Sequence, residues 1–170
     1  MNTYNWTSFI KRININAPVS AIYEMWATPI GLEKWFLRQC MVTDKSNGAK
    51  DSRELLSNVD KFVWRWFGYA DDVVEKGSIL LATGKDELQF TFGQEGAEDM
   101  ICTVKIYAED GETICEIKQE NIPEDEKGKA YYHVGCSIGW TFYLANLKSI
   151  LEGGIDLRNK NEHLRNMINS

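Results

Sequence analysis

Histidine, cysteine and proline are scarce in this chain, whose 170 residues include two His, four Cys and three Pro. The cysteines, at positions 40, 102, 115 and 136, form no C-x-x-C pair and no spacing typical of metal ligands. They are too few to cross-link a chain of this length, so we expect reduced thiols in the core of a cytoplasmic protein. This scarcity excludes a disulfide scaffold and a zinc site, and we predict no metal and no other cofactor.

Positive charge is in short supply as well. Nineteen Lys and Arg residues stand against 25 Asp and Glu residues, which gives a formal net charge of −6, and no Lys/Arg cluster reverses this balance locally. Such a surface repels phosphate backbones and anionic membranes, so nucleic acid is not predicted as a partner. The chain also lacks G-x-S-x-G, H-E-x-x-H, G-x-x-x-x-G-K-[ST] and G-x-G-x-x-G, and no catalytic residue is therefore assigned.

Long apolar runs are missing too. The N-terminal residues do not contain the apolar segment that a secretory signal requires. Residues 130–147 reach the lower edge of a membrane span in length, but His133, Ser137, Thr141 and Asn146 interrupt their apolar character. We expect instead a long helix that is buried on most sides, and no membrane span.

Aromatic residues, by contrast, are abundant: the chain has six Trp, seven Tyr and seven Phe. In residues 61–69 they alternate, which places Phe62, Trp64 and Trp66 on one face of a predicted strand. Large flat rings on one face indicate that this strand packs against a bulky apolar surface.

The periodicity of the chain predicts one domain, residues 1–170, with an α+β order of elements. Asp110-Gly111 is a strong signal for a tight hairpin, and sequential strands joined by short turns indicate an antiparallel meander. Residues 44–60 are polar, could form a helical turn or two at 52–56, and are either a lid or a loop. The predicted elements are strands at 6–16, 40–43, 61–69, 77–82, 86–92, 99–108 and 112–120, and helices at 19–28, 30–35, 127–152 and, peripherally, 155–170.

Only the helix at 127–152 is long enough to cover one face of a sheet of this size. The predicted architecture is therefore a helix-grip fold, in which a curved antiparallel sheet wraps around one long C-terminal helix. Two short helices follow the first strand.

Two blocks of sequence support the same architecture through a family resemblance. The opening I-N-I-N-A-P-V from Ile13 to Val19, with Trp26 and Trp35-Phe36 after it, resembles the entry of the START-like (SRPBCC) superfamily. The closing block GWTFYLANLKSILEGGIDLR, residues 139–158, resembles the same superfamily, near the bacterial branch with homologues of the heat-shock chaperone ATPase activator. The resemblance implies a cavity between sheet and helix that often holds lipids or other apolar ligands, and no single reaction.

The main functional hypothesis is non-catalytic binding of a small hydrophobic or amphipathic molecule in such a cavity. Bulky rings can shape a pocket or fill it, so a closed core remains the competing interpretation. The candidate cavity residues are Trp64, Trp66, Phe90, Phe92, Val104, Ile117, His133, Ser137, Trp140 and Leu144.

Two other functions remain open. A protein-interaction module that regulates a partner such as a chaperone would act through exposed residues. A cyclase or hydrolase, as some START-like relatives are, would need an acid or base inside the cavity, for which His133 is the candidate. Cys136, three residues from His133, would complete a minimal nucleophilic pair, but no orienting group or oxyanion donor is identifiable.

Several polar residues have simpler expected roles. Strand alternation turns Arg65 outward, where a surface or cross-strand ion pair is expected rather than a bound carboxylate. Alternation in residues 112–120 turns Cys115 and Gln119 inward. Asp156 and Arg158 are expected to fasten the tail to the body of the protein.

Overall fold

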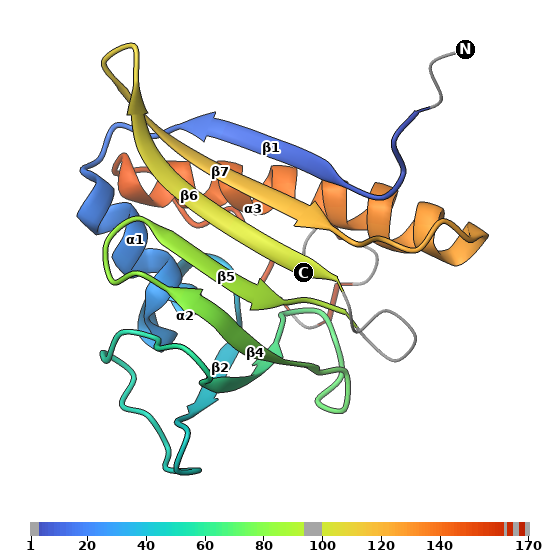
Figure 1. Ribbon diagram of the computed structural model, residues 1–170, viewed down its shortest axis with the longest axis horizontal. Coiled ribbons are helices and arrows are strands. Elements are labelled where there is room, and N and C mark those ends of the chain that lie inside the picture. Colours follow the sequence, from blue (N-terminus) through green and yellow to red (C-terminus); the bar gives the residue numbers. More distant parts are fainter. Residues whose placement is uncertain (1–3, 94–99, 162, 165–166, 169–170) are drawn as a thin grey trace.

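One seven-stranded antiparallel sheet and one long helix dominate the protein (Figure 1). The computed structural model describes residues 4–93, 100–161, 163–164 and 167–168. The strand order is β1-β7-β6-β5-β4-β3-β2. The elements are β1 Phe9–Asn14, α1 Val19–Ala27, α2 Pro29–Trp35, β2 Gln39–Thr43, β3 Lys61–Arg65, β4 Glu75–Ala82, β5 Glu87–Thr91, β6 Ile101–Glu109, β7 Glu112–Glu120, η1 Gly128–Gly135 and α3 Cys136–Leu151.

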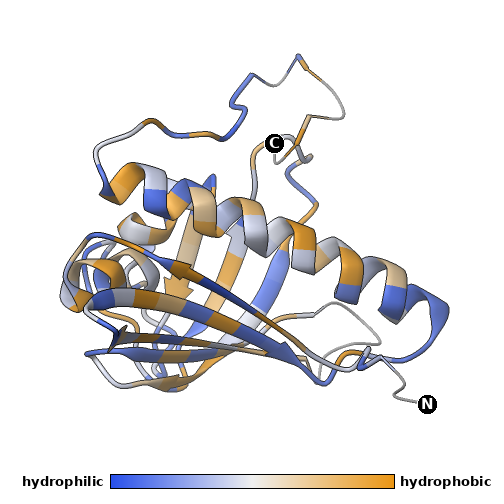
Figure 2. Cartoon of the chain, turned by 90° about the horizontal axis from the view of Figure 1, so that it is seen from above, coloured by the Kyte–Doolittle hydropathy of each residue, from blue (hydrophilic) through white to orange (hydrophobic). Residues whose placement is uncertain are grey.

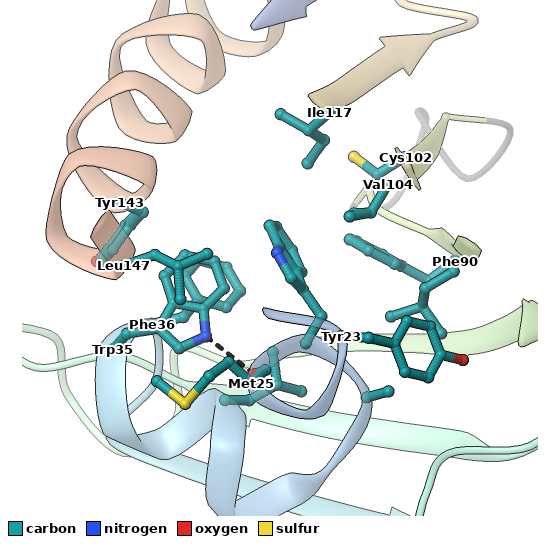
Figure 3. Packing of buried hydrophobic residues seen from close by; sticks show 14 of the residues in the cluster. Tyr23, Met25, Trp35, Phe36, Phe90, Cys102, Val104, Ile117, Tyr143 and Leu147 are labelled. Carbon is teal, nitrogen blue, oxygen red and sulfur yellow. Dashed lines mark hydrogen bonds between the residues drawn. The ribbon is translucent and has the colours of Figure 1, made fainter. Parts of the chain in front are cut away.

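The two short helices follow β1 as predicted. Pro18 immediately precedes α1, and Thr28 separates the helices, with its hydroxyl accepting a hydrogen bond from the N–H of Gly31 at 3.0 Å. A threonine in this position satisfies one of the free N–H groups at the start of a helix. The indole N–H of Trp35 donates to the carbonyl of Met25 at 2.9 Å, which joins α2 to α1 (Figure 3).

The hairpin between β6 and β7 turns at Asp110-Gly111, as the sequence predicted. Both residues have positive φ, 49° and 82°, the conformation that a type I′ turn requires. β7 pairs along its length with β6 and, on its other side, with β1. The first and last strands of the chain therefore lie next to each other at one edge of the sheet.

The predicted helix at 127–152 is present, but its first turns are a π-helix, η1, which continues directly into α3. Gly128 opens η1 where a Cβ would approach the carbonyl oxygen of Pro123 to 1.9 Å, so this close contact requires glycine. The long helix lies across one face of the sheet, with α1 and α2 at one end (Figure 2). The helix-grip prediction is confirmed.

Asn146 connects the long helix to two other parts of the chain. Its side-chain N–H donates to the carbonyl of Trp35 at 2.7 Å, and its oxygen accepts from the backbone N–H of Leu157, also at 2.7 Å. The side chain is fully buried, so both bonds are shielded from water. Asn146 therefore fixes the end of α2 and the beginning of the tail to the same turn of α3.

Four local predictions differ from the structure. The strand predicted at 61–69 ends at Arg65, and residues 52–56 form turns rather than a helical turn or two. The described residues of 155–170 form no helix, because this tail is held by tertiary contacts and leaves apolar side chains such as Ile155 and Leu164 exposed. The strand predicted at 99–108 begins at Ile101, and residue 99 lies outside the described residues.

The segment between β2 and β3 is fastened to the short helices and to the sheet. The N–H of Leu56 donates to the carbonyl of Ala27 at 2.7 Å, and that of Val59 donates to Ile79 at 2.9 Å. Lys50 and Asp60 form a buried ion pair at 2.7 Å within the segment. Across the described part of the chain, no helix has the length and apolar character needed to cross a membrane.

Candidate functional site

The rings predicted to share one interior surface do come together. The ring centroids of Trp64 and Phe90 are 5.2 Å apart, those of Phe90 and Phe92 are 6.3 Å apart, and Trp140 of α3 lies 5.5 Å from Phe92. These are ordinary distances for tilted and edge-to-face aromatic pairs. We call these four residues together with Trp66 the aromatic core.

Trp66 lies just beyond the end of β3 and is only partly buried. Its ring packs edge-on against Phe36 at 5.7 Å and against Trp64 at 6.5 Å. Phe92, at the end of β5, is also partly buried. The aromatic core therefore has two rings near its margin, whereas Trp64, Phe90 and Trp140 lie inside.

Three of the smaller candidate residues belong to the same cluster. Val104, Ile117 and Leu144 are buried and extend it along β6, β7 and α3. Figure 3 shows Val104 and Ile117 on the strands, facing the helix that carries Tyr143 and Leu147. Ser137 is half-buried, and its backbone carbonyl accepts a hydrogen bond from the hydroxyl of Thr141 at 2.8 Å. The rings and aliphatic side chains together line one continuous interior.

His133 is placed differently from the other candidates. Its ring nitrogens bond to the hydroxyl of Tyr4 and to the carbonyl of Trp6, both at 2.9 Å, and its ring packs edge-on against Phe9. It thereby joins η1 to the N-terminal segment. The structure places His133 against this segment, and not among the residues of the aromatic core.

Cys136 does not have the properties of a nucleophile. Burial raises the pKa of its thiol to about 11, although Gln119 acts in the opposite direction. A nucleophilic cysteine needs a lowered pKa, because the thiolate is the reactive form. Among the described residues, no group of three or more His, Cys, Asp and Glu side chains could hold a metal ion.

A small group of polar side chains lies under the long helix, at one end of the aromatic core. The indole N–H of Trp140 donates to the side-chain oxygen of Gln119 at 3.0 Å, and the thiol of Cys102 donates to the same oxygen at 3.7 Å. The amide N–H of Gln119 donates to the sulfur of Met100 at 3.6 Å. Gln119 faces inward, as predicted, and holds one strand, one helix and one loop together.

Glu75 is the residue of this interior that sequence reasoning missed. Its carboxylate is 5% exposed and accepts a hydrogen bond from the N–H of Gly93 at 2.8 Å. Burial raises the pKa of Glu75 to about 7, against the opposing effect of that N–H. The pKa of the Cys136 thiol is raised mainly by burial and, to a lesser extent, by Glu75. The Glu75 carboxyl therefore lies within electrostatic range of the thiol. A signal existed: extending the predicted strand at 77–82 by two residues gives Glu75 the same parity as the inward residue Ile79.

Trp64 has a polar group in the same interior as the Glu75 carboxyl. Its indole N–H is buried and has no hydrogen-bond partner among the described residues. Cys40 lies directly across from it on β2, where burial raises the pKa of the thiol and the indole N–H acts in the opposite direction, but the contact lacks the geometry of a hydrogen bond. On the other side, Trp64 is paired in register with Glu75 of β4. A donor without an acceptor and a buried carboxyl therefore occupy facing positions on neighbouring strands.

Comparison with known proteins places the chain in a family. Residues 16–152 match the family described as Activator of Hsp90 ATPase homolog 1-like protein. No curated protein matches the chain in sequence.

Solved structures show the same fold at low identity. One is the Aha1 dimer from Colwellia psychrerythraea, with 15% identity, a TM-score of 0.66, and 86% of this chain and 97% of that one covered. A protein from Staphylococcus saprophyticus gives 16% identity and a TM-score of 0.65, with 89% and 96% covered. CalU16 from Micromonospora echinospora has 19% identity and a TM-score of 0.63, with 88% of this chain and 77% of that one covered. With most of its length matched by the family and the expected helix-grip fold in place, the chain belongs to the Activator of Hsp90 ATPase homolog 1-like proteins.

Proposed function

We infer that the protein binds a small amphipathic molecule between the sheet and the long helix. The observation that carries this proposal is the pair of polar groups on facing strand positions, the unpartnered indole N–H of Trp64 and the buried carboxyl of Glu75. A buried donor without an acceptor is costly, so its presence favours a partner that arrives with a ligand. Burial raises the pKa of Glu75 to about 7, so its protonated form, which is also able to donate, is accessible near neutral pH. Both groups suit a ligand with an oxygen acceptor.

The apolar part of such a ligand would lie against the aromatic core. The rings are close enough to touch, so a ligand has to displace side chains rather than enter an empty space. Trp66 and Phe92 are the rings best placed to move, because both are partly buried at the margin. The mixture of flat apolar walls and a few polar groups is typical of small-molecule sites.

The test is native mass spectrometry of the purified protein with medium-chain fatty alcohols and fatty acids, followed by titration of tryptophan fluorescence. Trp64→Phe keeps a ring but removes the N–H, and we expect it to weaken binding of the alcohol about tenfold. Trp6→Phe, in the N-terminal segment, is the control and should leave affinity unchanged. Absence of binding to the wild-type protein, or equal affinity in Trp64→Phe, would contradict the proposal.

A second candidate function is supported by the outer face of the long helix. Tyr131 and Ile138 are 73% and 63% exposed, and Val134 is also exposed between them. All three are exposed along the continuous helical segment that runs from η1 into α3. Exposed apolar side chains that cluster in this way mark protein interaction sites. Since the family is named for activators of the Hsp90 ATPase, the partner we propose is a chaperone of the Hsp90 type.

This candidate predicts a direct effect on the chaperone. Mixing the protein with a purified Hsp90-type chaperone should change its ATPase rate, and replacing both Tyr131 and Ile138 by serine should lower the apparent affinity at least about tenfold. Ile155→Ser, an equally exposed apolar residue in the tail, is the matched control. An ATPase rate that the wild-type protein leaves unaltered counts against this function and leaves the ligand proposal standing.

A further inference from the structure

A pocket on the outside of the fold has two arginine side chains in its lining. It has a volume of about 630 Å³ and lies where α2, the start of β2, the end of β3 and the loop before β4 meet. Its lining residues are Glu33, Arg38, Gln39, Arg65 and Asp71. Two guanidinium groups in one pocket stand out in a chain whose formal net charge is −6.

Hydrogen bonds to the backbone and to Gln39 hold the two arginines in place. The backbone N–H of Arg38 donates to the carbonyl of Arg65 at 2.8 Å, which ties the two residues together. Arg65 donates from its Nη1 to the side-chain oxygen of Gln39 at 2.8 Å, which is a cross-strand contact with its register partner. Arg65 faces outward, as the alternation predicted, but among the described residues it makes hydrogen bonds to Gln39 and to the Asp71 carbonyl instead of the predicted ion pair. The guanidinium groups are therefore positioned by the fold before any ligand arrives.

Asp71 supplies a carboxylate to this pocket from a loop. Its Oδ1 accepts from Nη2 of Arg38 at 2.6 Å, and its backbone carbonyl accepts from Nε of Arg65 at 2.9 Å. The Asp71 side chain is 85% exposed, whereas that of Arg38 is 23% exposed. An exposed ion pair of this kind contributes little stability, so the Asp71 carboxylate can move away at low cost.

Arg38 is incompletely satisfied by this arrangement. Its Nε is buried and has no hydrogen-bond partner in the described part of the chain. Nε and one Nη of a guanidinium form the fork that takes both oxygens of a carboxylate. Asp71 occupies only the Nη2 side of that fork. A carboxylate that replaced Asp71 would bond to both nitrogens.

We propose that this pocket binds the carboxylate of a small acidic molecule, and that Asp71 is an internal substitute that the ligand displaces. Glu33 stays in the pocket, since its Oε1 accepts the backbone N–H of Cys40 at 2.8 Å. With Asp71 moved away, two arginines and one glutamate leave a single positive charge, which one carboxylate balances. A phosphate dianion would leave an excess of negative charge beside Glu33, so the site selects a carboxylate. This site is separate from the proposed interior site.

The experiment is a titration of the ¹⁵N-labelled protein with butyrate, a monocarboxylate, followed through the Nε–Hε signal of Arg38. Butyrate should shift this signal in a saturable way, and the neutral analogue butyramide should not. Inorganic phosphate is the second arm and should bind at least about tenfold more weakly than butyrate. Equal affinity for phosphate, or shifts that leave the Arg38 signal in place, would overturn the proposal.

Variants of the pocket test the displacement directly. Asp71→Asn removes the internal competitor and should tighten butyrate binding about tenfold, whereas Asp72→Asn, its neighbour in sequence, should not. Arg38→Lys keeps the charge but loses the fork and should weaken binding at least about tenfold. Arg12→Lys, on the far edge strand β1, is the matched control, and thermal melts confirm that each variant is folded. Unchanged affinity in Asp71→Asn would refute the role of that residue.

Discussion

Replacing Arg158 by alanine is expected to lower the free energy of unfolding by about 3–5 kcal/mol, because it removes one partner of a buried ion pair. The Arg158 side chain is 2% exposed and makes a two-point contact with Asp156, at 2.9 Å and 2.6 Å. It also donates to the backbone carbonyls of Leu37 at 2.9 Å and Lys34 at 2.7 Å. The variant would leave these buried carbonyls without their donors and release the tail from the end of α2. These contacts are the physical reason why Asp156 and Arg158 fasten the tail to the body of the protein, as predicted.

Urea denaturation measures the loss of stability in Arg158→Ala, and two further variants serve as comparisons. Arg158→Lys retains the charge but not the planar fork, so its loss of stability should fall between those of wild type and alanine. Arg12→Ala removes an exposed ion pair with Glu109 and should cost less than about 1 kcal/mol. A loss in Arg158→Ala no larger than in Arg12→Ala would show that the clamp does not contribute to stability.

Replacing Glu75 by glutamine is expected to stabilise the protein at pH 8, by up to about 3 kcal/mol. Burial raises the pKa of Glu75 to about 7 from an ordinary value of 4.5. Between these two values the folded protein binds more protons than the unfolded chain, so stability falls as the pH rises through this window. Glutamine cannot ionise and removes that fall. Below pH 4.5 both states carry a protonated carboxyl, and the advantage of the variant should disappear.

The measurement is the unfolding midpoint in urea from pH 4 to pH 8, compared between wild type and Glu75→Gln. Glu126→Gln, at an exposed helical residue just before η1, is the matched control and should leave the pH profile of the wild type unchanged. Parallel profiles for wild type and Glu75→Gln would mean that Glu75 does not titrate in this range. The same variant also keeps a donor for a ligand, so stability and binding can be separated.

Local patterns were enough to predict most of the fold. The Asp110-Gly111 turn, the alternation around Trp64 and the long helix predicted at 127–152 all depend on neighbours in sequence, and the structure has each of them. What the sequence could not provide was the pairing between distant segments. Glu75 matters because it lies opposite Trp64, eleven residues away, and beneath the long helix.

The same limit explains the residues that were placed differently. His133 was a cavity candidate because it lies in the predicted long helix, yet its position depends on Tyr4 and Trp6, more than a hundred residues earlier. The tail was predicted as a helix from its spacing, but Arg158 and Asn146 hold it as an extended connection. In both cases tertiary hydrogen bonds, which the periodicity of the sequence does not reveal, determine where the residues lie.

The π-helical start of the long helix makes the protein sensitive to chain length. A π-helix closes its hydrogen bonds one residue later than an α-helix, so removing a single residue from η1 would favour the ordinary repeat. Each residue of a π-helix turns the chain by less than the about 100° of an α-helix, so the change of repeat would rotate the side chains upstream of the deletion relative to α3. His133 would then lose its alignment with Tyr4 and Trp6, while α3 stayed in place. One-residue deletions here would therefore detach the N-terminal segment rather than shorten a helix harmlessly.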